Sequence, residues 1–128
     1  KKSILFSILP LMALFLFIAA YEPAPVPDDL DLGWPEEVMT AFDKACFDCH
    51  TSESGNVKAK GKLNFSKWED YKLTKQVGKL DGIKETVEGG DMPPKKYLEK
   101  YPDNALTEEE VKLITEWASA EMDKLMGE

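Results

Sequence analysis

The sequence predicts a small all-α domain, preceded by a transmembrane helix and a proline-rich linker. Three observations support this prediction. Apolar residues recur at helical spacing in several segments, no segment alternates as a strand would, and two sites carry the residues that begin a helix. The chain has 128 residues, which is enough for one domain and short extensions. We expect the domain to occupy residues 34–128.

The N-terminus carries two lysines and then an apolar run at residues 4–20. One interpretation is a cleaved secretory signal with Ala20 before the cut, and the other is an uncleaved anchor helix over residues 1–21. Seventeen helical residues span about 26 Å, which is short but sufficient for a thin bilayer. We favour the anchor, because the chain retains the apolar run. The lysines then stay inside, which predicts a single-pass protein of the cytoplasmic (inner) membrane with its domain on the periplasmic side.

Residues 22–33 contain three prolines and four acidic residues, so they are expected to form a linker rather than a packed element. Twelve residues in polyproline geometry reach roughly 37 Å. The linker is either a tether that positions the domain or a spacer with no other role.

The net charge is −8, and every basic residue apart from the single histidine is a lysine. No basic face indicates nucleic acid binding, and we predict none. An acidic surface either favours a partner with a basic docking patch or is only solvated.

The first helix of the domain is expected to begin at Pro35, because proline suits the first helical position and the two glutamates after it suit the positive end of the helix dipole. Its apolar positions recur at helical spacing. They are Val38, Phe42, Ala45, Cys46 and Cys49. The polar, glycine-containing residues 51–62 that follow are expected to form a loop.

A second helix is predicted after Ser66 and Glu69, which match a capping box. Its apolar and aromatic positions are Trp68, Tyr71, Leu73, Val77 and Leu80. Gly78 weakens the prediction of one continuous helix. Ile83 and Val87 therefore suggest a further short helix, which Gly89 and Gly90 would end.

The strongest helix start in the chain is Thr107 with Glu110, a second capping box. The apolar stripe after it consists of Val111, Ile114, Trp117, Ala118, Met122 and Leu125. We expect this last helix to cross the first one near Trp117, with Trp117 in the core rather than serving as an electron relay.

Residues Cys46-Phe47-Asp48-Cys49-His50 form the Cys-x-x-Cys-His motif, by which haem c is attached. The two thiols form thioethers with the haem vinyl groups, and the histidine binds the iron. A zinc site or an iron–sulfur cluster would need four ligands, and the chain has only two cysteines and one histidine. A disulfide would not need His50, and a thioredoxin-like pair would need a βαβ setting. We therefore predict one covalent haem c, whose burial would also stabilise a small core.

His50 is the only histidine, so two histidines of one chain cannot bind the iron. We predict Met92 as the second axial ligand, because it lies between glycines that allow close approach and two prolines that stiffen the loop. The alternatives are a Met92 that only fills the core, an open site, or ligation by Lys95 or Lys96 after loss of a proton. The other methionines are less well placed. These are Met12, Met39, Met122 and Met126.

The attachment motif, the Met92-Pro93 loop and the closing amphipathic helix resemble a class I monohaem cytochrome c. The chain further resembles the bacterial haem-binding domain family of exported cytochromes over residues 38–118. The segments that carry the resemblance are Leu63-Asn64-Phe65-Ser66-Lys67-Trp68, Lys75-Gln76-Val77, Glu88-Gly89-Gly90-Asp91-Met92-Pro93 and Leu106-Thr107-Glu108-Glu109-Glu110. The stretch between His50 and Leu63 is short for the family and lacks its aromatic segment. One wall of the haem crevice is therefore expected to be open or covered by another subunit.

The resemblance implies a cytochrome c-like fold and an electron carrier rather than an enzyme, either a tethered shuttle or a subunit of an oxidoreductase complex. Its expected partners are a respiratory or photosynthetic electron-transport complex, or a redox protein, together with the bilayer that residues 4–20 enter. No small-molecule substrate is expected. Two other functions stay open. One is a haem sensor or peroxidase-like module with an open iron site, and the other is a structural subunit whose anchor matters most.

Overall fold

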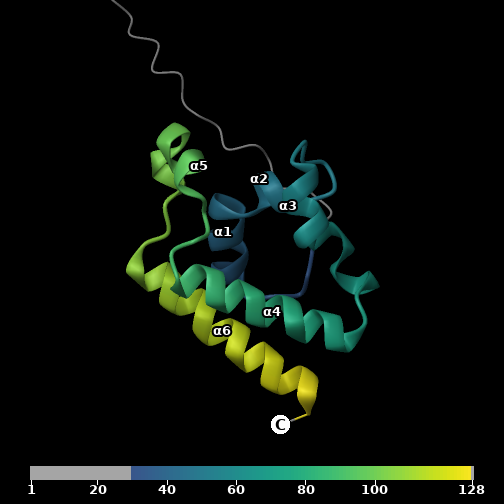
Figure 1. Cartoon of the computed structure of the whole chain (residues 1–128). Helices are drawn as coiled ribbons and strands as arrows, with labels where there is room; N and C mark the ends of the chain where they lie inside the picture. Colours follow the sequence, from purple (N-terminus) through teal and green to yellow (C-terminus); the bar gives the residue numbers. More distant parts are fainter. Residues whose placement is uncertain (1–29, 128) are drawn as a thin grey trace, which may run out of the picture.

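Two long helices, α4 (Leu73–Glu88) and α6 (Glu108–Met126), lie side by side and run in opposite directions (Figure 1). The computed structural model describes residues 30–127, and these residues contain helices and no strand. The predicted all-α domain is confirmed. The predicted anchor at residues 1–21 and residues 22–29 of the predicted linker lie outside the described residues.

Shorter elements pack above this pair of helices (Figure 1). They are α1 (Glu36–Ala45), α2 (Phe47–His50), α3 (Val57–Lys62), the 3-10 turn η1 (Phe65–Asp70), α5 (Lys95–Lys100) and the 3-10 turn η2 (Pro102–Asn104). None of the helices between residues 30 and 127 has the length and apolar character needed to cross a bilayer.

The helix α6 begins as its sequence predicts. The Thr107 hydroxyl accepts a hydrogen bond from the Glu110 backbone N–H at 3.2 Å, and the Glu110 carboxylate accepts one from the Thr107 N–H at 2.8 Å. These two bonds satisfy donors that the first turn of a helix leaves unpaired. Gly127, with φ +81°, ends the helix in the left-handed conformation that glycine adopts without strain.

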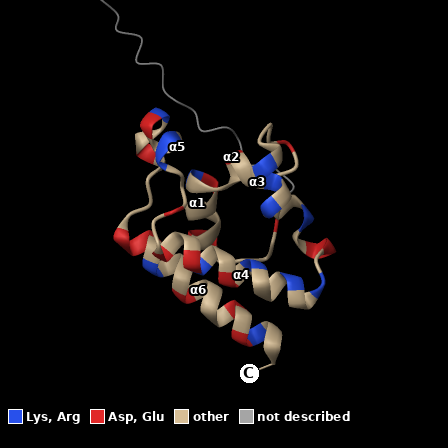
Figure 2. Cartoon of the chain, viewed as in Figure 1, with Lys and Arg blue, Asp and Glu red and all other residues tan. Residues whose placement is uncertain are grey.

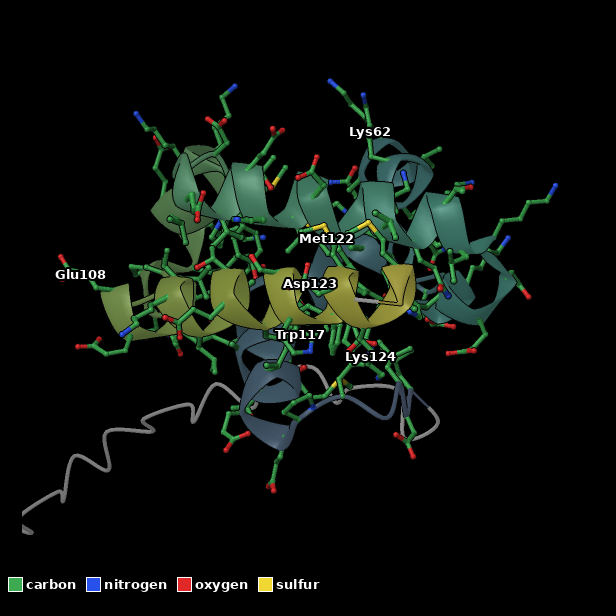
Figure 3. All side chains as sticks on the ribbon, turned by 90° about the horizontal axis from the view of Figure 1, so that it is seen from below. Lys62, Glu108, Trp117, Met122, Asp123 and Lys124 are labelled. Carbon is green, nitrogen blue, oxygen red and sulfur yellow. The ribbon has the colours of Figure 1, made fainter. Side chains whose placement is uncertain are left out.

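The helices α1 and α6 meet as expected near Trp117, whose ring centroid lies 5.4 Å from that of Phe42. Figure 3 shows Trp117 on the α1 side of α6. Lys44 reaches across this contact and binds the Glu110 carboxylate at 2.7 Å. Burial acts to raise the pKa of Glu110, but the hydrogen bonds from Lys44 and from the Thr107 backbone outweigh it and lower this pKa.

Trp34 is the centre of the aromatic core, although no sequence pattern pointed to it. Its ring lies 4.6 Å from Trp117 and 5.0 Å from Trp68, measured between centroids, and it also packs against Phe42 and Phe65. This residue directly follows the predicted linker, so its apolar partners are distant in sequence. It joins α1, η1 and α6 into one core.

Three local predictions were wrong. Residues 51–62 are not all loop, because the Asn56 side chain accepts a hydrogen bond from the Ala59 N–H and so begins α3. Ser66 does not begin an α-helix. The Asn64 side chain accepts from the Ser66 N–H and begins the 3-10 turn η1 instead.

The third wrong prediction was a separate short helix at Ile83 and Val87. The helix α4 continues through Gly78 and Gly82 to Glu88, so Ile83 and Val87 belong to the same helix rather than to a separate one. Two glycines inside a helix each cost about 1 kcal/mol relative to alanine. Packing of Leu80, Ile83 and Val87 into the core compensates for this cost. The predicted stop at Gly89 and Gly90 is confirmed.

Candidate functional site

A cavity of about 540 Å³ lies among α1, α2, α3, α4 and the loop that follows α4. Its lining residues come from these five segments and from the start of η1. They are Phe42, Cys46, Cys49, His50, Asn56, Lys58, Ala59, Lys62, Leu63, Phe65, Gly78, Lys79, Gly82, Ile83, Thr86, Val87, Met92 and Pro94. This volume is within the range of sites that hold small molecules and cofactors. All four residues that the sequence predicts as cofactor ligands line this cavity.

The attachment motif forms one short turn at the end of α1. The helix α1 stops at Ala45, and the backbone of Cys46 leaves the helical region before α2 begins. The N–H groups of Cys49 and His50 then donate to the Cys46 carbonyl at 3.1 and 3.0 Å. The two thiols are not joined by a disulfide. The sequence predicts that the two thiols continue the first helix, and this prediction is wrong. They stand on a separate turn at the cavity wall.

The imidazole of His50 is held by the backbone that follows α3. Its Nδ1 lies 3.0 Å from the Leu63 carbonyl oxygen. A carbonyl can only accept, so Nδ1 carries the proton and donates. The other ring nitrogen, Nε2, then keeps its lone pair for a metal, and the same bond fixes the orientation of the ring. Leu63 belongs to a segment that carries the family resemblance, but nothing in the sequence indicated that its backbone carbonyl would orient His50.

The thiol of Cys46 lines the cavity and is held in its protonated form. Burial, and to a smaller extent repulsion from Cys49, raise its pKa to about 12, so the thiol is protonated at neutral pH. Thiol redox catalysis and zinc binding both use thiolates. Among residues 30–127, moreover, no three histidine, cysteine or acidic side chains gather closely enough to hold a metal ion. The described residues therefore do not assemble the ligand set of a structural zinc site.

Met92 lies on a loop whose backbone is held against the end of α4. The N–H groups of Asp91 and Met92 both donate to the Thr86 carbonyl, at 2.9 and 3.2 Å. Gly90 has φ +69°, a conformation that glycine adopts without strain, and this turns the chain back toward the cavity. The half-buried Met92 side chain lines the cavity, whereas the competing candidates Lys95 and Lys96 are exposed and do not line it.

A hydrogen bond connects this loop to the attachment turn. The Tyr97 hydroxyl, on α5, donates to the Asp48 carboxylate at 2.7 Å, and the Asn104 side chain donates to the same hydroxyl at 2.6 Å. Asp48 lies inside the attachment motif, and Tyr97 follows Met92 by five residues. The two halves of the candidate site are thus held together across 49 positions of sequence. Sequence reasoning missed this contact, because Tyr97 is distant in sequence and the Cys-x-x-Cys-His motif assigns no role to the position of Asp48.

At two of the positions where α4 lines the cavity it presents backbone and no side chain, and we call this part of the helix its glycine face. Gly78 and Gly82 are four residues apart, so they lie on the same side of the helix, and both line the cavity. A Cβ built at either position would meet no other atom within 4 Å. The surrounding protein therefore does not require glycine there, and the two residues leave room for a flat group to lie close to the helix.

The substitution Gly82→Ala tests this interpretation. Helix propensity alone would raise the free energy of unfolding by about 1 kcal/mol. A methyl group added to a filled cavity lowers the free energy of unfolding by about 1 to 3 kcal/mol. This loss exceeds the gain in helix propensity, so we expect the free energy of unfolding of the cofactor-bound protein to fall by about 1 kcal/mol. Urea unfolding measures this change. Gly61→Ala is the matched control, because Gly61 lies on α3 and does not line the cavity. If both substitutions stabilise the protein equally, nothing lies against α4.

Comparison with known proteins gives one match. A family model described as a haem-binding domain matches residues 54–120, which is more than half of the chain and includes Met92. The match begins after His50, so the attachment motif directly precedes it. Neither the curated proteins nor the solved structures include one that matches this chain.

Proposed function

The chain belongs to the haem-binding domain family, and on this premise we propose that it is a monohaem c-type cytochrome that carries single electrons. The observation that carries the proposal is the meeting of Cys46, Cys49, His50 and Met92 in one cavity. Thioethers at the two cysteines would retain the haem permanently. The two remaining side chains would bind its iron from the two sides.

The residues of the cavity fit such a group. The His50 ring has its Nδ1 hydrogen engaged with Leu63, so Nε2 is available as a ligand. The thioether of Met92 is neutral and needs no deprotonation, which a lysine amine would. The glycine face of α4 and the aromatic ring of Phe65, whose centroid lies 6.4 Å from that of His50, offer apolar surface to a porphyrin.

Electron transfer follows from this ligand set. When bound, the haem supplies an iron that changes its charge by one electron. His50 and Met92 would both bind the iron, which would leave no ligand position for a substrate, and a methionine ligand would raise the reduction potential. The hydrogen bonds that His50 donates to the Leu63 carbonyl and that the Met92 loop donates to the Thr86 carbonyl would hold both ligands in place in either oxidation state. The chain would therefore act as a carrier and not as an enzyme.

The proposed location rests on the N-terminal sequence. The apolar residues 4–20 would anchor the chain in the cytoplasmic membrane, and residues 22–33 would hold the haem domain on the periplasmic side. A carrier in this position would serve a respiratory or photosynthetic complex, either as a subunit or as a tethered shuttle.

A potentiometric titration of the full chain, followed by its absorption spectrum, tests the proposed function. We expect one reversible transition whose midpoint slope corresponds to a single electron, and no turnover of hydrogen peroxide. Rapid peroxide turnover, or a spectrum that does not return on reoxidation, would favour the peroxidase-like or sensor alternative and contradict the carrier.

A further inference from the structure

The mouth of the cavity is basic although the chain as a whole is acidic. Residues 57–79 contain seven lysines and two acidic residues, whereas the other described residues contain seven lysines and 18 acidic residues. Figure 2 shows this separation, with basic residues on α3 and the first turns of α4 and acidic residues along α6. We propose that this basic surface docks an acidic patch of a redox partner protein. The inference rests on the proposed function and adds the partner's charge to it.

We call this surface the lysine rim. It consists of the exposed residues Lys58, Lys62, Lys72 and Lys75. Lys58 and Lys62 line the cavity from α3, and Figure 3 shows Lys62 extending from α3 away from α6. The Lys79 amine, from α4, donates a hydrogen bond to the Lys62 carbonyl oxygen and so joins the two helices at the mouth. A partner on the lysine rim would therefore lie beside the cofactor.

The charge of the lysine rim is not balanced within the described chain. The ion pairs found between residues 30 and 127 join Lys44, Lys112 and Lys124 to glutamates, and none involves the lysine rim. Lys75 instead lies over the Tyr71 ring, 4.5 Å from its centroid. At the neighbouring Lys79, burial and then repulsion from Lys75 and Lys62 lower the pKa. An acidic surface placed here would relieve this repulsion.

Exposed apolar residues lie within the same segment. Val57 is 74% exposed and Leu73 is 52% exposed, and they are the first residues of α3 and α4. Only one other large apolar side chain of the described residues, Met126, is comparably exposed. Protein interfaces combine an apolar centre with a polar and charged rim. The placement of both residues among the lysines therefore favours a protein partner over a small anion.

The acidic remainder of the chain limits what the partner can be. A broad anionic lipid surface would also face the acidic residues outside the lysine rim and repel them. A protein with a local acidic patch would meet the lysine rim alone. Charges separated by more than about 10 Å are screened at 0.1 M salt, so a partner at the mouth would sense the nearby lysines more than the net charge of −8.

The test follows oxidation of the reduced full chain, with its haem bound, by two small reagents at about 0.1 M ionic strength. One reagent is anionic hexacyanoferrate(III), and the other is a cationic cobalt(III) phenanthroline complex. The variant Lys58→Glu/Lys62→Glu reverses two charges of the lysine rim. The variant Lys112→Glu/Lys124→Glu makes the same change in net charge on α6 and serves as the control.

We expect the rim variant to react about tenfold more slowly with the anion and faster with the cation, and the control to change by less than about twofold. Poly-L-glutamate should slow the wild type with the anion and leave the rim variant unaffected. Equal rates for all three proteins would overturn the inference while leaving the carrier intact. If neither reagent oxidises any of them, the proposed function itself fails.

A vesicle experiment separates the two macromolecular partners. If phosphatidylglycerol vesicles retain the wild type more than the rim variant, and poly-L-glutamate has no effect on the oxidation rate, the lysine rim serves a lipid surface and the inference is wrong. If retention by these vesicles is the same for both proteins, and poly-L-glutamate slows only the wild type, the acidic protein partner is supported.

Discussion

Replacement of both attachment cysteines, Cys46→Ser/Cys49→Ser, is expected to abolish permanent retention of the haem. Neither serine can form a thioether, so the group would be held only by His50, Met92 and apolar contact. Acidified organic solvent should then extract the haem, and haem staining of a denaturing gel should fall to background. We also expect the variant to lose several kcal/mol of stability when the haem dissociates, because binding contributes free energy to the folded state alone.

The single variant Cys46→Ser is an internal control for this experiment. It leaves the thiol of Cys49, which stands on the same turn at the cavity wall, and should keep one thioether. Haem that resists extraction from the double variant would show that the two cysteines do not attach it. A retained haem stain in that variant would therefore contradict the assignment of the motif.

Loss of the second ligand, in Met92→Ala, is expected to open one side of the iron. The oxidised wild type should show the weak red charge-transfer band of a methionine–iron(III) bond, and the variant should lack it. The reduction potential of the variant should fall, because a thioether favours the reduced iron. The absorption spectrum of the oxidised protein and a redox titration measure the two effects.

Met122→Ala is the matched control, since it removes the same side chain from a site that does not line the cavity. Met122 packs against the core from α6, and Figure 3 shows it on the α4 side of that helix. This variant should lose about 2 kcal/mol of stability or more and keep the red band. If the band survives in Met92→Ala, another residue binds the iron and the ligand assignment is wrong.

The parts of the fold that depend on local sequence could be predicted. The start of α6 required only Thr107 and Glu110, which are three residues apart and cap each other. The end of α4 required only a glycine pair. The start of α3 was also encoded locally, by Asn56, but a polar stretch with two glycines indicated a loop more strongly. Helix boundaries in short elements depend on which of several local signals prevails.

The contacts that support the candidate site could not be predicted, because they join residues that are distant in sequence. The Leu63 carbonyl meets His50 across 13 positions, and Tyr97 meets Asp48 across 49. Gly78 looked like a weakness in a helix and Gly82 was not singled out, and only the cavity beside them gives the two glycines a role. The ligand residues carry recognisable chemistry, whereas the groups that orient them are ordinary backbone and surface residues.

The central claim is a haem whose iron is bound on both sides by residues of this chain. The most direct test adds carbon monoxide to the reduced wild-type protein at neutral pH. We predict that the absorption spectrum does not change over minutes, because the proposed Met92 ligand would occupy the position that the gas would take. Rapid formation of the carbon monoxide complex would contradict the claim and indicate an open site suited to sensing or catalysis.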